Sequence, residues 1–147
     1  MLRVMLVDDE PPARRGFRRL LQAHPDVEVV AEAGSVAEAR AQAAAVQPDA
    51  IFLDVELADG LGFDLVGQVS PMPAVVFVTA HDLYAVKAFD VSALDFLLKP
   101  VDPQRLSVTI DRLRRHRLDA ARAEAPARER QDDAELDAEP QPDGAQR

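Results

Sequence analysis

Five short apolar runs recur at a steady spacing, and they constrain the fold more than any other feature of this chain. Four of them are nearly uninterrupted, which is typical of strands covered on both faces. The intervening segments carry amphipathic or capped patterns that predict helices. The predicted strands are 2–7, 27–31, 50–53, 74–78 and 93–98, and the predicted helices are 13–23, 36–46, 61–69, 83–91 and a helix beginning at 103.

Capping signals support three of the predicted helix starts. Ser35 is followed three residues later by Glu38, the spacing of a capping box. Asp82 is expected to cap the fourth helix, and the pair Asp102-Pro103 gives an N-cap followed by proline at the first helical position. The helices therefore begin shortly after each strand, with little room for long loops.

Five repeats of strand then helix predict an α/β fold with a single doubly wound, five-stranded parallel sheet. Right-handed crossovers leave few topologies, and the strand order 2-1-3-4-5 of a flavodoxin-like fold is the expected one. Ligands of such sheets bind beyond the carboxyl ends of the strands. The residues that end each strand are therefore the candidate site.

Polar side chains end four of the five predicted strands. Asp8 and Asp9 follow the first strand, Asp54 the third, Thr79 the fourth and Lys99 the fifth. Taken singly, an acid pair after a strand is more often a solvated turn or a helix cap, and a threonine or a Lys-Pro pair means little. Because all of these residues stand at the matching ends of separate strands, they predict one crevice that holds carboxylates, a hydroxyl and an ammonium group.

These groups together suit phosphoryl transfer to a carboxylate. Carboxylates that repel one another favour a hard cation such as Mg²⁺, which prefers oxygen ligands. A carboxylate nucleophile can then attack phosphorus while the cation and a lysine neutralise the equatorial oxygens. A neighbouring hydroxyl can bond the transferred group and signal its presence.

Composition excludes several other classes. The chain has 147 residues and no cysteine, which removes disulfide frameworks, thiolate zinc sites and cysteine nucleophiles. A net charge of −9 disfavours binding to DNA phosphates, and 5% aromatic residues without tryptophan disfavour a base-stacking surface. No apolar run approaches ~18 residues and the first residues do not resemble a signal peptide. A cytoplasmic protein with no membrane partner is expected.

The end of the sequence changes in character. Residues 118–147 carry nine acidic residues against four arginines, and Leu136 is the only large aliphatic residue after Leu118. Low hydrophobicity with high charge does not offset the entropy of ordering. A folded domain over residues 1–120 is therefore expected, with 121–147 as an acidic, proline-containing disordered tail or linker.

The motifs resemble a known family. The segments MLVDDEPPAR, PDAIFLDVELADGLGFDLV and VVFVTAHDLYAVKAFDVSALDFLLKPVDPQRL closely resemble the receiver domain of two-component response regulators. The resemblance covers about residues 1–117. The stretch from His81 to Arg105 is most similar to the LytTR (AlgR/LytR-type) regulators.

The resemblance implies a role for each acidic residue of the crevice. Asp54 would be the phosphoacceptor. Asp9 and Asp54 would bind Mg²⁺ directly, Asp8 would act through water, and the backbone carbonyl of Glu56 would be the third protein ligand. Glu56 and His81 occupy positions that tune phosphate lifetime in this family. Alanine at position 58, where the family often has proline, is a departure that implies a slightly different loop.

The resemblance also implies which residues take part in the conformational switch. Thr79 would be the switch hydroxyl, with the small Ala80 beside it leaving the phosphoryl site open. Phe96 stands at the switch-aromatic position, where many relatives have tyrosine. Lys99 would pair with the acceptor or its phosphate, and the Lys99–Pro100 bond is expected to be cis.

The partners follow from the same resemblance. A sensor histidine kinase would donate the phosphoryl group, and phosphorylation would favour a homodimer. LytTR regulators continue into a DNA-binding domain, so this chain is either a stand-alone receiver or part of a longer regulator, and alone it is not expected to bind DNA. The predicted interface residues are Tyr84, Lys87, Phe89, Asp90, Asp95 and Arg112.

Two other functions fit the residues less well. A phosphatase of the HAD type also uses a carboxylate nucleophile, a hydroxyl and a lysine, but it needs Asp-x-Asp after the first strand and a substrate cap. A docking module that only resembles a receiver would not need the full phosphorylation set. The expected protein is thus a phosphoacceptor switch with self-catalysed phosphorylation and dephosphorylation, and not a conventional enzyme.

Overall fold

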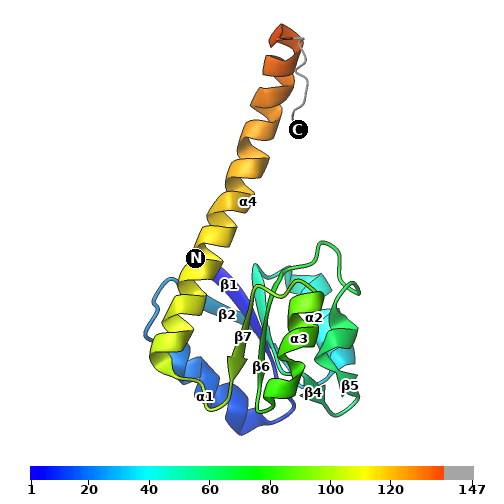
Figure 1. The fold of residues 1–147 in the computed structure, drawn as a ribbon, viewed down its shortest axis with the longest axis vertical. Helices are drawn as coiled ribbons and strands as arrows, with labels where there is room; N and C mark the ends of the chain where they lie inside the picture. Colours follow the sequence, from blue (N-terminus) through cyan, green and yellow to red (C-terminus); the bar gives the residue numbers. More distant parts are fainter. Residues whose placement is uncertain (138–147) are drawn as a thin grey trace. The chain divides into compact units, whose positions relative to one another are not determined.

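The computed structural model describes the backbone of residues 1–137 and the side chains of residues 1–123. Residues 1–113 form one compact unit and residues from 114 onward belong to a second. The elements (Figure 1) are β1 (Leu2–Val7), α1 (Pro11–Leu21), β2 (Val27–Ala33), α2 (Val36–Val46), β3 (Ala50–Leu53), β4 (Glu56–Leu57), β5 (Gly60–Leu61), the 3-10 turn η1 (Gly62–Leu65), β6 (Ala74–Thr79), the 3-10 turn η2 (Asp82–Tyr84), α3 (Ala85–Asp90), β7 (Asp95–Leu98) and α4 (Pro103–Asp137).

The main sheet has five parallel strands in the order β2-β1-β3-β6-β7. This confirms the predicted order, because β6 and β7 are the fourth and fifth strands of the sequence pattern. Val7 of β1 pairs with Leu53 of β3, so Asp8 and Asp54 leave the sheet side by side. Parallel pairing therefore brings the predicted strand-end residues to one edge of the sheet.

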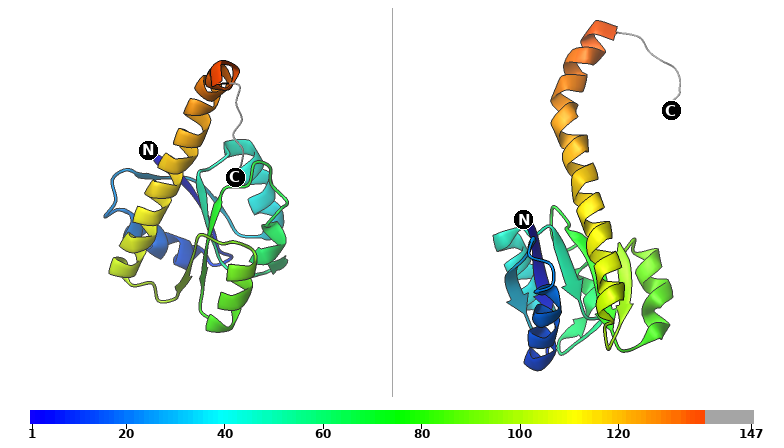
Figure 2. Two further views of the ribbon diagram at one scale, coloured as in Figure 1. Left: turned by 45° about the horizontal axis from the view of Figure 1, so that its top comes forward. Right: turned by 90° about the vertical axis from the view of Figure 1, so that its left-hand side faces the viewer.

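The two faces of the sheet carry separate apolar cores because successive residues of a strand point to opposite faces. Val4, Leu6 and Phe52 pack against α1 and the first turns of α4, whereas Met5 and Ile51 pack on the other face. Figure 1 shows α2 and α3 covering that second face, and in the right-hand view of Figure 2 α1 and the start of α4 face the viewer.

Two helix starts follow the predicted caps. The Ser35 hydroxyl accepts a hydrogen bond from the Glu38 backbone N–H (3.0 Å), and Glu38 accepts one from Gly34 N–H (2.7 Å). Asp102 accepts a hydrogen bond from Arg105 N–H (2.9 Å) ahead of Pro103 in α4. In each cap a side-chain oxygen accepts an N–H group of the first turn, which has no partner within the helix.

A third side chain that accepts hydrogen bonds at the start of α2 comes from a distant loop. The Asp59 carboxylate accepts hydrogen bonds from the N–H groups of Val36 (2.8 Å) and Ala37 (3.1 Å). These backbone hydrogen bonds hold the pKa of Asp59 below its usual value. The turn between β4 and β5 is thereby joined to α2, which the spacing of residues along the chain does not reveal.

The predicted helix over 61–69 does not form. That segment instead contributes to the β4–β5 hairpin and then to the short turn η1. Gly62 packs so tightly under the Asp54 carbonyl that a Cβ would collide with it, and Gly67 has a φ of +84°. Close backbone approach and a left-handed residue replace helical packing here.

The predicted helix over 83–91 is shorter than expected and divided. It consists of η2 and the six-residue α3, and the Asp82 side chain makes no capping hydrogen bond because Asp82 is the first residue of η2. The Lys99–Pro100 peptide bond is cis as expected, and so is Ser70–Pro71.

Helix α4 continues to Asp137, through part of the stretch where the sequence predicts a tail or linker. The remainder of that predicted tail, residues 138–147, lies outside the described residues. The boundary at residue 120 stays a prediction. Within the described part of the chain, none of the helices has the length and apolar character needed to cross a membrane.

Candidate functional site

Lys99 joins the acid groups at the carboxyl edge of the sheet. Its Nζ donates to Asp8 Oδ2 (2.7 Å) and to Asp54 Oδ2 (3.0 Å). The other oxygens of these carboxylates accept backbone N–H groups, Asp8 Oδ1 from Glu10 (2.9 Å) and Asp54 Oδ1 from Glu56 (3.3 Å). The side chains of Asp8 and Asp54 are only 12% and 11% exposed, so their positions are set by these bonds.

The protonation of the three groups is coupled to their burial. Burial raises the pKa of Asp54 above its ordinary value, and Lys99 offsets this only in part. Burial acts to lower the pKa of Lys99, but hydrogen bonds to Asp8 and Asp54 outweigh it and raise the pKa. Lys99 therefore stays charged between the carboxylates, and Asp54 is more basic than an exposed aspartate, which favours its use as a nucleophile.

A cavity of about 400 Å³ opens beside Asp54. Thr79 is 1% exposed at the end of β6, and its hydroxyl accepts the His81 N–H (3.4 Å). The cavity is lined by Asp9, Glu10, Asp54, Glu56, Leu57, Thr79, Ala80, His81 and Lys99. Of the residues predicted for phosphoryl transfer and metal binding, all except Asp8 line this cavity, and Asp8 is linked to it through Lys99.

The metal prediction rests on oxygen donors from three positions. Asp9 is exposed at this cavity, and Asp54 and Glu56 line it as well. Among the described residues, no three His, Cys, Asp or Glu side chains are arranged to hold a metal ion. The predicted set uses only two carboxylates directly and a backbone carbonyl, so its donors fit a hard cation that retains water ligands.

A cluster at the mouth of the cavity was not foreseen from the sequence. The Glu56 carboxylate accepts the Tyr84 hydroxyl (2.8 Å) and lies 3.3 Å from His81 Nε2. Its hydrogen bond to Glu56 raises the pKa of Tyr84, which keeps the phenol protonated as a donor. Tyr84 was predicted to lie at an interface, and its separation of 28 residues from Glu56 leaves no local signal of this hydrogen bond in the sequence.

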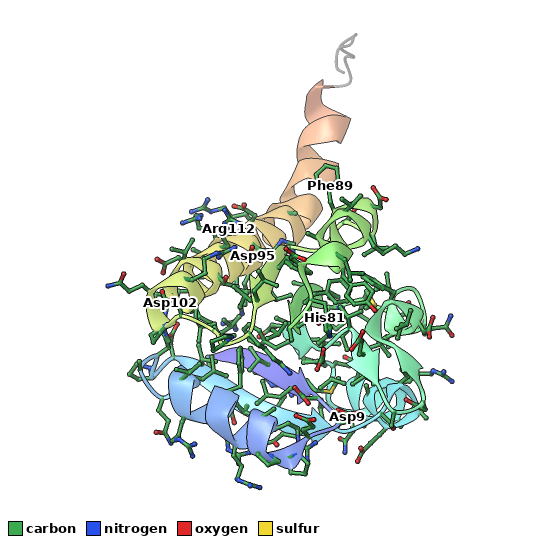
Figure 3. All side chains as sticks on the ribbon, turned by 60° about the horizontal axis from the view of Figure 1, so that its bottom comes forward. Asp9, His81, Phe89, Asp95, Asp102 and Arg112 are labelled. Carbon is green, nitrogen blue, oxygen red and sulfur yellow. The ribbon has the colours of Figure 1, made fainter. Side chains whose placement is uncertain are left out.

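Asp95, another predicted interface residue, is engaged within the chain. Its carboxylate accepts from Arg105 (2.6 and 2.9 Å) and from the Thr109 hydroxyl (2.6 Å), and Arg112 lies 3.3 Å away. In Figure 3, Asp95 and Arg112 lie beside one another. Burial acts to raise the pKa of Asp95, but the hydrogen bonds from Arg105 and Thr109 outweigh it and lower the pKa.

The remaining predicted interface residues lie on α3. Phe89 is 83% exposed, and Val86 and Leu83 nearby are also largely exposed. The Lys87 ammonium lies 5.8 Å from the centre of the Phe63 ring. Phe96 of β7 is partly buried against the core on the α2 and α3 side of the sheet.

A doubly wound sheet whose carboxyl edge holds an acid pair, a central aspartate, a hydroxyl and a bridging lysine defines a class of signalling domain. The response regulator receiver domain family matches residues 4–111. The chain belongs to this family, the receiver domains of two-component signalling, which act as switches rather than conventional enzymes.

Curated relatives agree with this assignment. The chain is 44% identical over 119 residues to the transcriptional regulatory protein BtsR of Salmonella typhi, covering 80% of this chain and 50% of that protein. It is 44% identical over 114 residues to the sensory transduction protein LytT of Enterococcus faecalis, covering 76% and 47%. Both are LytTR-type regulators, which confirms the predicted class. The chain spans about half the length of the curated relatives it matches.

A solved structure supports the fold. The response regulatory domain of mrkE from Klebsiella pneumoniae superimposes with a TM-score of 0.69 at 30% identity, covering 78% of this chain and 96% of that one. Receiver domains typically bind Mg²⁺ at the phosphorylation site and have a histidine kinase as partner. The family match favours the receiver over the phosphatase considered from the sequence.

Proposed function

We propose that this receiver takes a phosphoryl group from a histidine kinase onto Asp54, in the cytoplasm, with Mg²⁺ as cofactor. The single observation that carries the proposal is the Lys99 ammonium, bonded to both Asp8 and Asp54 in a buried setting. It holds a basic carboxylate in one orientation beside an open cavity. That arrangement suits an oxygen nucleophile better than a solvated turn.

The geometry of these side chains supports the following transfer. An Asp54 oxygen attacks the phosphorus of the phosphohistidine, the new O–P bond forms, and the P–N bond to the histidine breaks. Lys99 is charged and hydrogen-bonded to Asp54, so it can stabilise the negative charge that develops on the equatorial oxygens of the phosphoryl group. The same groups without the kinase would allow self-catalysed transfer from a small phosphodonor. Attack of water on the phosphorus would then break its bond to the Asp54 oxygen and release inorganic phosphate and the free carboxylate.

Asp9, Asp54 and the Glu56 backbone carbonyl would hold the Mg²⁺, with Asp8 acting through water. When bound, the cation neutralises oxygens of the transferring phosphoryl group. Asp9 suits this role because it is exposed at the cavity, whereas Asp8 is already bonded to Lys99 and to the Glu10 N–H.

We further propose that phosphate on Asp54 draws the Thr79 hydroxyl toward it and lets Phe96 change its packing. Thr79 ends β6 and pairs with Leu98 of β7, so a shift there reaches the surface formed by α3, β7 and the start of α4. This surface carries the exposed Phe89 and is the proposed dimer face. The names of the relatives suggest a transcriptional output, and at a net charge of −9 the chain itself is not expected to bind DNA.

The experiment compares the wild-type protein with the Asp54→Asn variant after incubation with acetyl phosphate and Mg²⁺. Intact-mass measurement should show one phosphoryl group on the wild type and none on the variant. Chelation of the metal with EDTA should abolish labelling, because the charge on the transferring oxygens is then not neutralised. Equal labelling of the two proteins would disprove the assignment of Asp54.

A further inference from the structure

A second cavity, of about 430 Å³, opens on the face of the sheet that α1 covers. Its floor is formed by buried side chains of three neighbouring strands, Leu6 of β1, Phe52 of β3 and Val78 of β6. Phe17 of α1 lines one side, with its ring centre 4.8 Å from that of Phe52, and Val101 of the loop after β7 lines another. The phosphoryl transfer proposed above makes no use of this cavity.

Gly16 contributes to the wall that α1 forms. A Cβ atom at this position would meet no other atom within 4 Å, so the space beside the glycine is open. Glycine inside a helix lowers stability relative to alanine, and here it does not make way for a neighbouring group. The missing side chain at position 16 therefore leaves room in the cavity.

The size and lining of the cavity suit a small organic molecule. Pockets for such ligands measure about 300–1,000 Å³ and are mostly apolar, with a few polar groups that fix the orientation of the ligand. The charged side chains that line this cavity are Asp8, Arg14 and Lys99. Asp8 is bonded to Lys99, and Lys99 is also bonded to Asp54. This leaves Arg14 as the charged group to which a ligand can bind.

The Arg14 guanidinium has one nitrogen to spare. Its Nε donates to Glu32 Oε1 (3.1 Å) and its Nη1 to the Asp8 carbonyl (2.5 Å), while Nη2 has no partner among the described residues. Glu32 also pairs with Arg18, so two cations share a single carboxylate. The Arg14 side chain is only 20% exposed. A guanidinium N–H that lacks an acceptor in such a setting costs free energy, which an anionic ligand would recover.

We propose that the cavity between α1 and the loop after β7 binds a small amphipathic carboxylate. The apolar body of the ligand packs on Leu6, Phe52 and Val78, and its carboxylate accepts hydrogen bonds from Arg14 Nη2. Lys99 lines both this cavity and the phosphoacceptor cavity, so the bound molecule lies beside the lysine that holds Asp54. Binding itself does not depend on phosphorylation of Asp54.

The test is a titration of the ¹⁵N-labelled 147-residue chain with 4-phenylbutyrate, followed by the amide signals in NMR spectra. The dissociation constant should be on the order of 0.1–1 mM, as expected for a ligand of this size. The signals that move should belong to α1, to the end of β1 and to Val101, and those of α3 should stay in place. 4-Phenylbutyramide has the same apolar body without the charge and should bind about tenfold more weakly.

Two variants examine the two parts of the site. Gly16→Leu should weaken binding of 4-phenylbutyrate by at least about tenfold, because the new side chain takes up the open space. Arg14→Gln should bind the carboxylate and the amide equally, because the charge that distinguishes them is gone. Arg18→Gln is the matched control, since it removes the same charge beside Glu32 at a residue that is not among the described lining residues. Binding to this control should change by less than about twofold.

Thermal melts check that each variant is folded. The proposal is disproved if no signal moves up to about 10 mM ligand, or if the amide binds the wild type as tightly as the carboxylate. Unchanged binding to a folded Gly16→Leu would also disprove it. Cavity signals that move with protein concentration, without ligand, would show that a second copy covers the cavity and would overturn the proposal as well. None of these outcomes bears on phosphorylation of Asp54, which the mass measurement tests separately.

Discussion

At the scale of single residues, Asp95 shows how one buried carboxylate can join a strand to a helix. It was predicted to pair across a dimer interface, yet it is 5% exposed and bonded to Arg105, Thr109 and Arg112 of α4. It also accepts the N–H of Phe96, the residue at the switch-aromatic position (2.8 Å). Asp95 therefore joins β7 to α4, next to Phe96, whose packing is proposed to change on phosphorylation.

The Asp95→Asn variant should lose about 2 kcal/mol of unfolding free energy at pH 7, measured by urea denaturation. Removing one partner of a buried ion pair costs several kcal/mol, and Arg105 and Arg112 are partly exposed, which reduces the loss.

The pH dependence follows from the lowered pKa of Asp95. Because the folded-state pKa lies below the unfolded value, the stabilisation is present above the ordinary aspartate pKa and is lost as pH falls through the folded-state pKa. The difference in unfolding free energy between wild type and Asp95→Asn should thus shrink as the pH falls below the ordinary aspartate pKa. Glu28→Gln, at an exposed residue of β2, is the control. A difference that stays constant down to pH 2 would contradict the assigned role.

At the scale of elements, two glycines differ in how much space surrounds them. Gly62, in η1, packs against the Asp54 carbonyl and 3.0 Å from Leu53 Cγ, measured from where its Cβ would stand. Gly16 lies within α1, where a Cβ would meet nothing within 4 Å. Gly62 is required by its packing under Asp54, and Gly16 is not required by any contact.

Alanine at these two positions should therefore shift stability in opposite directions. Gly62→Ala should lower the unfolding free energy by about 2 kcal/mol, as overpacking does, and should slow labelling of Asp54 because the loop carrying it must move. Gly16→Ala should raise the unfolding free energy by about 0.5–1 kcal/mol, since glycine is a poor helix former. Denaturation curves measure the unfolding free energies of the two variants, and intact mass measures the rate at which Asp54 is labelled in Gly62→Ala. Unaltered labelling in a destabilised Gly62→Ala would show that the loop is not coupled to the site.

At the scale of the whole molecule, the proposed output is a change in association. The face formed by α3, β7 and the first turns of α4 carries Phe89, Val86 and Lys87 at its surface. With Asp95 and Arg112 bonded to each other, contact across a two-fold axis would depend on the apolar side chains and on Lys87 and Asp90. Symmetric pairing is the commonest route to an oligomer.

Beryllofluoride, a phosphate mimic, should convert the protein from monomer toward dimer in sedimentation velocity. The coupling between two sites is typically ~1–3 kcal/mol, so the dissociation constant should fall by about 5- to 150-fold. Phe89→Ala and Lys87→Glu should each weaken the dimer, whereas Arg40→Glu, on α2 and away from this face, should not. A protein that stays monomeric in the presence of beryllofluoride would refute the proposed change in association.

The sequence by itself determined the five strands of the main sheet, their order and the polar residues that end four of them. These are recoverable because each strand's apolar run and the polar residue that ends it are local in the chain. Parallel pairing then brings Asp8, Asp54, Thr79 and Lys99 to one edge without further information. The caps by Ser35 and Asp102 are equally local, spanning three residues each.

Tertiary structure decided the features that depend on contacts between distant segments. The helix predicted at 61–69 became a hairpin and a turn because Gly62 must pass under the Asp54 carbonyl. Tyr84 donates a hydrogen bond to Glu56, 28 residues away, and Asp95 accepts one from Arg105. Hydrogen bonds and packing of this kind are fixed only when the sheet has formed, since periodicity reports which face a side chain occupies but not which side chain it meets there.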